Sequence, residues 1–359
     1  MQGQPAKRFL EGAAPASAPP PTLVVYGATL YHPDTMDDTD ESSPPIPAPA
    51  GRWAIIDIGS DTVHLLVADI REGEDTGRTV KVLSQRSVLL ELGRDVAVDG
   101  RIDSAQIPGL DATVTKYAKT ARREAKHLVV VGTEASRRAA NGSVVMERLS
   151  KRIDEPIRIL SGVREAQLGF RGVRPNLKGA GCQLVIDSGG ASTEVSVSQG
   201  REYVAGVSLP VGSALLAASL RGDPPSPISW ALSALPIGTA LSKLPQMQPK
   251  RAWATGGSAH HLAGLESAES THKSPRLSIA ELDELAHAFL TKSSQKLGQQ
   301  RHQDPRRVAL LPTGALILAA VLRAYNLEQC TVLSAGLREG ILLAASENPL
   351  GWWQDASFG

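Results

Sequence analysis

Two segments of this chain, residues 55–67 and 185–197, share one pattern. In each, an apolar strand-like run ends in Asp, a short turn of Gly and hydroxyl residues follows, and a second strand-like run comes next. Glycine leaves room for backbone N–H groups to wrap a phosphate, and the neighbouring hydroxyls add donors. We therefore predict two phosphate loops that grip one phosphate chain from both sides. Their predicted phosphate-binding residues are Gly59, Ser60, Asp61 and Thr62 in the first loop and Gly189, Gly190, Ala191, Ser192 and Thr193 in the second.

The first strand of each segment closes on an aspartate, Asp57 or Asp187. A carboxylate at this position is suited to a divalent cation or a water rather than to the anion itself. One Asp-x-Gly after a strand usually marks only a hairpin or a strand end. The prediction of a phosphate site therefore depends on finding two copies in the same strand context.

Length and composition favour a soluble protein of two domains. The 359 residues exceed the usual size of one core. Hydrophobic residues make up 42% of the chain and charged residues 21%, both ordinary values for a globular protein. A formal net charge of +1 argues against binding that depends on a strongly basic overall field, although it leaves room for a local basic pocket, so we expect no nucleic-acid partner.

The cysteines and the apolar runs indicate a cytoplasmic protein. Cys182 and Cys330 each lie next to an apolar run, which favours two buried thiols over a disulfide and fits a reducing compartment. The longest apolar stretch, residues 309–322, is interrupted by Pro, Thr and Gly and is too short to span a bilayer. The residues after Met1 do not resemble a signal peptide, so we expect no membrane partner.

The chain divides into an extension and two α/β halves. Residues 1–50 carry 10 of the 24 prolines and are predicted to be a disordered extension. Beyond them, strands and helices alternate in a pattern that repeats, which predicts domains at 51–175 and 176–350 with a cleft between them. The predicted strands are 53–57, 63–70, 80–90, 127–131, 157–160, 183–187, 193–198, 251–254 and 330–334; the predicted helices are 105–126, one after residue 133, 162–173 and one opened by a Ser278–Glu281 capping box.

Three strand-to-helix junctions carry small residues, at 132–133, 256–258 and 335–336. Helix N-termini present free N–H groups and a positive dipole end, which suit an anion. A single junction of this kind is more often a tight turn without a ligand. The interpretation as an anion site therefore depends on the presence of all three. Arg137, one turn beyond the first junction, is placed to reach a phosphate with a bidentate fork.

Five short motifs follow one another along the chain: Asp57–Ser60, Gly132–Asn141, Ser161–Ala166, Asp187–Glu194 and Gly336–Gly340. In these motifs the chain resembles the exopolyphosphatase and guanosine pentaphosphate phosphatase family, within the group that shares the actin, hexokinase and Hsp70 ATPase fold. The match runs from about residue 53 to 343. The resemblance implies duplicated actin-like, or ribonuclease H-like, domains around an interdomain cleft.

The resemblance also implies magnesium-dependent hydrolysis of a phosphoanhydride. Glu165 would be the general base, Arg137 and the loops would bind phosphate, and Asp187 and Glu194, together with Asp57, would hold Mg²⁺. The implied substrate is inorganic polyphosphate, with guanosine pentaphosphate as the alternative. The oligomeric state is left open, with a homodimer as one alternative.

Three residues depart from the family's pattern and keep a non-catalytic function open. Asp61 stands where the family usually has Asn, Arg164 where it usually has an acidic residue, and Ala191 where it usually has Gly. A sensor or interaction module that binds a phosphate ligand without turnover is therefore a further alternative.

Two other patterns are interpreted as structural. His260 and His261 are consecutive, so on a helix they point about 100° apart, and they have no further ligand at metal-site spacing. The basic stripe along the 105–126 helix favours a solvated face over a polyanion track. Its residues are Lys116, Lys119, Arg123 and Lys126.

Overall fold

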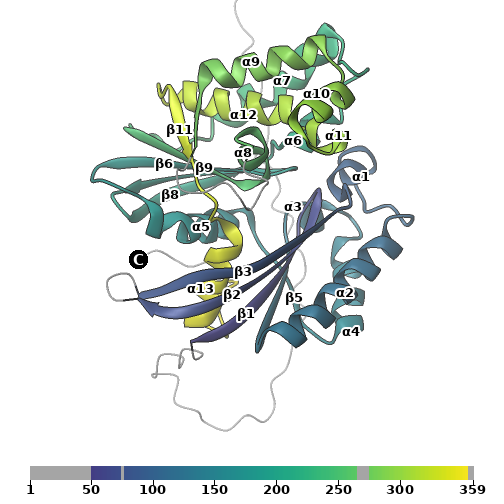
Figure 1. The fold of residues 1–359 in the computed structure, drawn as a ribbon, viewed down its shortest axis with the longest axis vertical. Helices are drawn as coiled ribbons and strands as arrows, with labels where there is room; N and C mark the ends of the chain where they lie inside the picture. The colour runs from purple at the N-terminus through teal and green to yellow at the C-terminus, as the bar shows by residue number, and fades with distance from the viewer. Residues whose placement is uncertain (1–49, 74–76, 265–274, 355–359) are drawn as a thin grey trace, which may run out of the picture. The chain divides into compact units, whose positions relative to one another are not determined.

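Two mixed β-sheets with the same strand order form the framework of the molecule (Figure 1). The structure, a computed structural model, describes residues 50–73, 77–264 and 275–354. The first sheet has the order β3-β2-β1-β4-β5, and the second has β8-β7-β6-β9-β11 with β10 added at the edge. In both, three antiparallel strands are followed by parallel ones. This repeated topology confirms the predicted duplicated α/β fold.

The strands are β1 (Gly51–Ile58), β2 (Thr62–Gly73), β3 (Gly77–Leu89), β4 (His127–Gly132), β5 (Ile157–Ile159), β6 (Cys182–Ser188), β7 (Thr193–Gln199), β8 (Glu202–Leu209), β9 (Arg251–Thr255), β10 (Arg276–Ser278) and β11 (Gln329–Val332). The helices are α1 (Leu92–Asp99), α2 (Ile107–Glu124), α3 (Glu134–Arg138), α4 (Gly142–Ile153), α5 (Gly162–Val173), α6 (Ser213–Ala217), α7 (Pro227–Leu241), α8 (Gly256–Leu262), α9 (Ile279–Thr291), α10 (Ser294–Arg301), α11 (Pro305–Val308), α12 (Leu311–Ala324) and α13 (Leu337–Glu347), with a 3₁₀ turn at Arg174–Asn176.

The packing on both faces of strand β1 explains why its sequence is apolar at almost every position. Ile56 and Ile58 belong to a core that includes residues of α2 and α4, whereas Trp53 and Ile55 belong to a core on the opposite face. Successive side chains of a strand point to opposite faces, so a central strand covered on both sides needs apolar residues throughout.

Helices α5 and α13 fill the space between the two sheets (Figure 1). Leu168 of α5 and Ile341 of α13 pack on the first sheet, while Phe170 of α5 packs with Val185 of the second. The last helix of the described chain thus belongs to the core of the first sheet. The predicted boundary between residues 175 and 176 stays a prediction.

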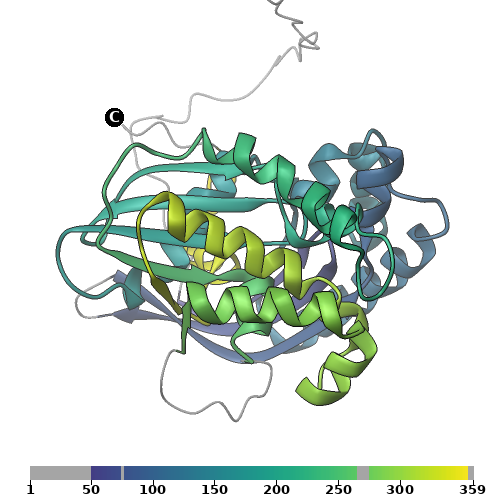
Figure 2. The same cartoon turned by 90° about the horizontal axis from the view of Figure 1, so that it is seen from above.

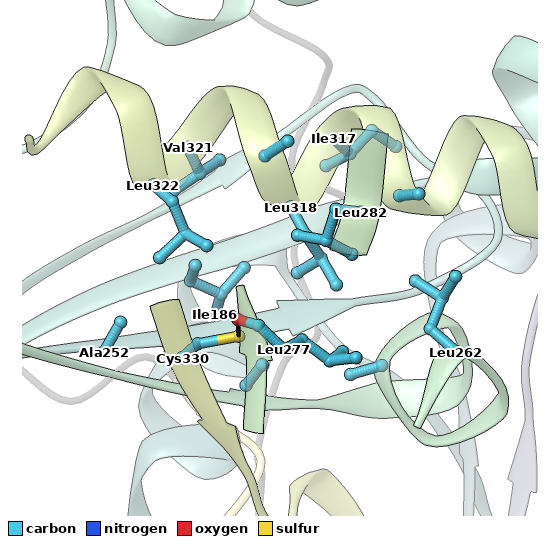
Figure 3. Close-up of a cluster of buried hydrophobic side chains, with 14 of the residues drawn as sticks. Ile186, Ala252, Leu262, Leu277, Leu282, Ile317, Leu318, Val321, Leu322 and Cys330 are labelled. Atoms are coloured by element: carbon cyan, nitrogen blue, oxygen red, sulfur yellow. Dashed lines mark hydrogen bonds between the residues drawn. The ribbon is translucent and has the colours of Figure 1, made fainter. Parts of the chain in front are cut away.

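The outer face of the second sheet is covered by α7, α8, α9 and α12 (Figure 2). Figure 3 shows Leu282 of α9 and Leu318 of α12 pointing toward Ile186 and Leu277 of the sheet. In the same core the Cys330 thiol lies 3.8 Å from the Leu277 carbonyl oxygen. Both cysteines are free thiols, as predicted, although Cys182 is only partly buried.

One helical run among the described residues, Pro305–Ala324, is long and apolar enough by length and composition to cross a membrane. The interrupted apolar stretch at residues 309–322 was predicted to be too short to span a bilayer. Most of the α12 side chains are buried, and Ile317, Leu318, Val321 and Leu322 pack in the core of the second sheet. In this structure the helical run Pro305–Ala324 therefore contributes a core helix, α12, to the second half of the chain.

The predicted strands all occur, with shifted ends, and so do the four predicted helices. The basic stripe on α2 has Lys116, Lys119 and Arg123 exposed, as expected of a solvated face. Elements that were not predicted include α1, α4, β8, α7 and α12. The predicted disordered extension lies outside the described residues except for its last position.

Candidate active site

The two loops meet at one cavity of about 520 Å³. All the predicted site residues line it except Thr193 and Arg137. The predicted site residues that line the cavity are Asp57, Gly59, Ser60, Asp61, Thr62, Glu165, Asp187, Gly189, Gly190, Ala191, Ser192 and Glu194. All three small-residue junctions also reach this cavity, through Thr133, Gly256 to Ser258 and Gly336. Residues from both halves of the chain therefore build a single site.

The first loop is a tight turn between β1 and β2. The Gly59 N–H donates to the Thr62 carbonyl at 3.1 Å. A Cβ on Gly59 would lie 2.8 Å from that same carbonyl oxygen, so the turn requires glycine. The Gly93 N–H in α1 donates to the Ser60 carbonyl at 2.6 Å and holds the loop from outside.

The second loop repeats this construction between β6 and β7. The Gly189 N–H donates to the Ser192 carbonyl at 3.0 Å, and the Ala214 N–H in α6 donates to the Gly190 carbonyl at 2.8 Å. Thr193 is fully buried behind the loop, and its hydroxyl donates to the Val211 carbonyl at 2.7 Å. Its side chain supports the loop rather than facing the cavity.

Six acidic side chains line the cavity, and four of them are the predicted catalytic or metal-binding residues. Asp57 and Asp187 stand at equivalent positions near the ends of β1 and β6, Glu165 lies in the first turn of α5, and Glu194 is the second residue of β7. Burial raises the pKa of Asp57, raises that of Asp187 to about 6 and, together with the nearby Asp187 charge, raises that of Glu194 to about 8. Such a cluster of buried carboxylates favours protons or a cation.

Glu165 is only 4% exposed and is held by Arg137. Burial, followed by the Glu194 charge, raises the pKa of Glu165 well above its usual range, while Arg137 opposes this shift. The Arg137 guanidinium also donates to Glu134 and to the Leu160 carbonyl. In this structure Arg137 therefore contacts the predicted base, and its phosphate contact stays a prediction.

Asp187 has a glycine on either side of its carboxylate. A Cβ on Gly256 would lie 2.3 Å from Asp187 Oδ1, and a Cβ on Gly169 would lie 3.4 Å from Oδ2. Gly256 has a φ of +85°, a conformation that favours glycine in any case. The small residues at this junction therefore make room for the aspartate.

The residues that depart from the family's pattern have different surroundings. Asp61 lies in the cavity wall, where a Cβ on Gly190 would fall 2.1 Å from its Oδ2. Ala191 also lines the cavity. Arg164 does not: it donates to the Trp352 carbonyl from Nε at 2.8 Å and to Gln167 from Nη1 at 2.9 Å. Arg164 thus links the turn after α13 to α5 and does not line the cavity.

The cavity also contains basic residues that the sequence interpretation did not assign. Arg338 Nη1 lies 3.5 Å from Asp57 Oδ2, and Arg307 Nη1 lies 3.1 Å from His261 Nε2. Together with His64 and His260, they line the cavity. His260 and His261 had been interpreted as a structural pair, yet both face the site. Arg338 stands inside the Gly336–Gly340 motif, a signal that could have identified it.

Comparison with known proteins places this site in a family. The chain is 29% identical over 304 residues to Exopolyphosphatase 1 of Mycobacterium leprae, covering 81% of this chain and 88% of that protein. It is 30% identical over 296 residues to the Guanosine-5'-triphosphate,3'-diphosphate pyrophosphatase of Aeromonas salmonicida, covering 81% of this chain but only 58% of that longer protein.

Solved structures agree with the fold. The PPX-GPPA enzyme of Aquifex aeolicus superposes with a TM-score of 0.67 at 26% identity, covering 82% of this chain and 99% of that one. An exopolyphosphatase from Cytophaga hutchinsonii, 21% identical, has the same fold, with a TM-score of 0.72 and coverage of 82% and 97%. The model of the Ppx/GppA phosphatase family matches residues 66–348. With the paired loops and the buried carboxylates in one cavity, the chain belongs to the Ppx/GppA phosphatase family.

Proposed function

We propose that this phosphatase removes the terminal phosphate of inorganic polyphosphate, with Glu165 as the general base. The observation that carries the proposal is the convergence on one cavity of two Gly-containing loops and four carboxylates, three of which are buried: Asp57, Glu165 and Glu194. The similarity to Exopolyphosphatase 1 of Mycobacterium leprae over most of both chains supports the same substrate.

In the proposed reaction, water attacks the terminal phosphorus and the bond to the bridging oxygen breaks. Glu165 accepts the proton of that water; burial raises its pKa and so makes the carboxylate a stronger base than an exposed glutamate. Arg137 fixes the Glu165 carboxylate through its ion pair. N–H groups of the loops and the Arg338 guanidinium offset the charge that builds on the phosphoryl oxygens.

The donor set fits a magnesium ion. Asp57 Oδ1 is buried and has no hydrogen-bond partner in the described part of the chain, and a second carboxylate, Asp187, faces the same cavity. Carboxylate oxygens are the ligands that Mg²⁺ prefers, and it usually completes its shell with waters and substrate phosphates. Among the residues that the structure describes, no three His, Cys, Asp or Glu side chains form a ready-made metal site, so substrate oxygens would be needed. Asp57, Asp187 and Glu194 would hold the ion, which neutralises phosphate charge when bound.

Guanosine pentaphosphate is the second candidate substrate. The relative from Aeromonas salmonicida carries a name of that activity, but this chain spans only 58% of its length. The same site chemistry would serve either anhydride, so direct comparison of the two substrates decides between them.

The test is magnesium-dependent phosphate release by the purified protein from tripolyphosphate, long-chain polyphosphate and guanosine pentaphosphate. We expect Glu165→Gln to lower kcat by about 10²- to 10⁴-fold. Glu147→Gln, which changes an exposed glutamate of α4, is the matched control and should leave the rate unchanged. Binding of polyphosphate without turnover would support a sensor instead, and an unaltered Glu165→Gln rate would remove Glu165 from its role.

A further inference from the structure

A second cavity, of about 370 Å³, lies directly beside the first. The two share Asp61 and Leu310 in their walls. Three arginines from separate parts of the chain line the second cavity: Arg94 of α1, Arg221 after α6, and Arg306 of α11. The remaining wall is largely apolar, with Ala214, Ala217, Leu220, Phe289 and Pro312 among its residues.

Two of these arginines form no ion pair within the described ranges, although the Arg94 charge acts on the neighbouring Asp95 and opposes the rise in its pKa. Arg94 makes no side-chain hydrogen bond or ion pair there, and Arg221 donates only to the carbonyls of Ala218 and Leu220, at 3.1 and 3.2 Å. Arg306 is engaged by Asp304 at 2.9 Å. Arg94 and Arg221 are exposed, so an anion can reach both.

The acidic residues of the same wall are offset in other ways. Both carboxylate oxygens of Asp223 accept from Ser294, one from its N–H at 2.7 Å and one from its hydroxyl at 2.6 Å. Asp304 raises the pKa of the Arg306 guanidinium most, and the Glu91 charge adds a smaller rise. Asp61 is partly exposed, and the burial of its carboxylate disfavours the charged form. Within the described residues, Arg94 and Arg221 are therefore the arginines of this wall that form no ion pair.

We propose that the second cavity is an outer phosphate subsite, where Arg94 and Arg221 bind phosphates of a polyphosphate chain that runs past Asp61 from the reacting end. The inference rests on the proposed function and extends it to chain length. A guanidinium fork matches the paired oxygens of a phosphate. Long chains reach both cavities, whereas tripolyphosphate is held mainly by the loops.

The experiment measures kcat and KM of the full chain for tripolyphosphate and for long-chain polyphosphate. The double variant Arg94→Gln/Arg221→Gln should raise the KM for the long chain about tenfold, because two charge-assisted contacts are lost. Its kcat/KM for tripolyphosphate should stay within about twofold of the unmodified protein. Arg123→Gln, at an exposed arginine of α2 outside both cavities, is the matched control and should change neither value.

Equal losses on both substrates, no loss on either, or an equal loss in Arg123→Gln would overturn the subsite. A loss confined to guanosine pentaphosphate would also overturn it, since a nucleoside would then occupy the cavity. If the unmodified protein releases no phosphate from any substrate, the proposed function fails instead. Titration calorimetry with long-chain polyphosphate then tests the subsite separately, with about tenfold weaker binding expected for the double variant.

Discussion

Asp61 lines both cavities and so lies on the route that we propose for the anionic substrate. Its Oδ1 is buried without a hydrogen-bond partner in the described structure. Burial first, and then the Glu91 charge, raise the pKa of Asp61 to about 7, while Arg307 opposes the shift. The side chain is thus largely neutral below pH 7 and charged above it, so its repulsion of substrate grows as pH rises.

We expect Asp61→Asn to remove this pH dependence. Asn keeps the shape without the charge, so at pH 8 the KM for polyphosphate should be up to about tenfold lower in the variant, and at pH 6 the two proteins should agree. Steady-state kinetics at both pH values measure this. Asp99→Asn, an exposed residue of α1, is the control. KM profiles that run parallel from pH 6 to 8 would show that Asp61 does not titrate in this range.

Among individual residues, those of the loops and the acidic side chains could be predicted because each lies in a short local sequence motif. Arg307, His260 and His261 were not assigned because their meeting depends on how α8 and α11 pack, which no local spacing reveals. Arg137 was predicted to hold phosphate, but its contact with Glu165 joins residues 28 positions apart. Only the packed structure shows that pair.

Among the elements, the crossing of α5 and α13 fixes the site most directly. A Cβ on Gly340 would lie 1.7 Å from the Leu168 carbonyl oxygen, and one on Gly172 would lie 1.9 Å from the Gly336 carbonyl oxygen. The two helices touch backbone to backbone at these glycines. Because α5 carries Glu165 and α13 carries Arg338, this contact sets how far apart the two side chains stand.

Gly340→Ala should therefore destabilise the protein by about 1–3 kcal/mol, since the methyl group forces the helices apart. Activity should fall in the fraction that stays folded. Denaturant unfolding and phosphate release measure the two effects. Gly238→Ala is the control, because nothing lies within 4 Å of its Cβ position in helix α7. Equal stability of the Gly340 and Gly238 variants would contradict the close crossing.

Elements with a clear period or cap could be predicted, and elements stabilised by packing could not. The Ser278–Glu281 capping box opens α9 as expected. Helix α7 continues through Pro236, which usually ends a helix, because Ser233, Ile237 and Ala240 stay buried on one face. The apolar and small residues of β8 show little alternation, and its place beside β7 comes from the sheet.

For the whole molecule, the buried carboxylates link folding to pH. The folded-state pKa of Asp187 is about 6 and that of Glu194 about 8, both above their ordinary values. The folded protein therefore binds more protons than the unfolded chain between these values, and its stability falls as pH rises. For Asp187 alone, the rise from 3.8 to about 6 predicts a loss on the order of 3 kcal/mol.

We expect the metal-free protein in chelator to unfold at lower urea concentration at pH 8 than at pH 5. Added Mg²⁺ should restore much of the difference at pH 8, because it replaces the lost protons as counter-charge. Glu194→Gln should lessen the dependence on pH. Stability that increases from pH 5 to pH 8 without metal would contradict this linkage.

The position of α13 also governs how the polypeptide matures on the ribosome. Ile341 and Leu342 complete the hydrophobic interior beneath β1 and β2, nearly 300 residues after those strands are made. A nascent chain that has emerged only through β5 leaves that interior open to water and to other chains. Protection by a chaperone should thus be needed until translation reaches the C-terminal helix, and ribosome-bound fragments lacking it should be sensitive to protease in their first sheet.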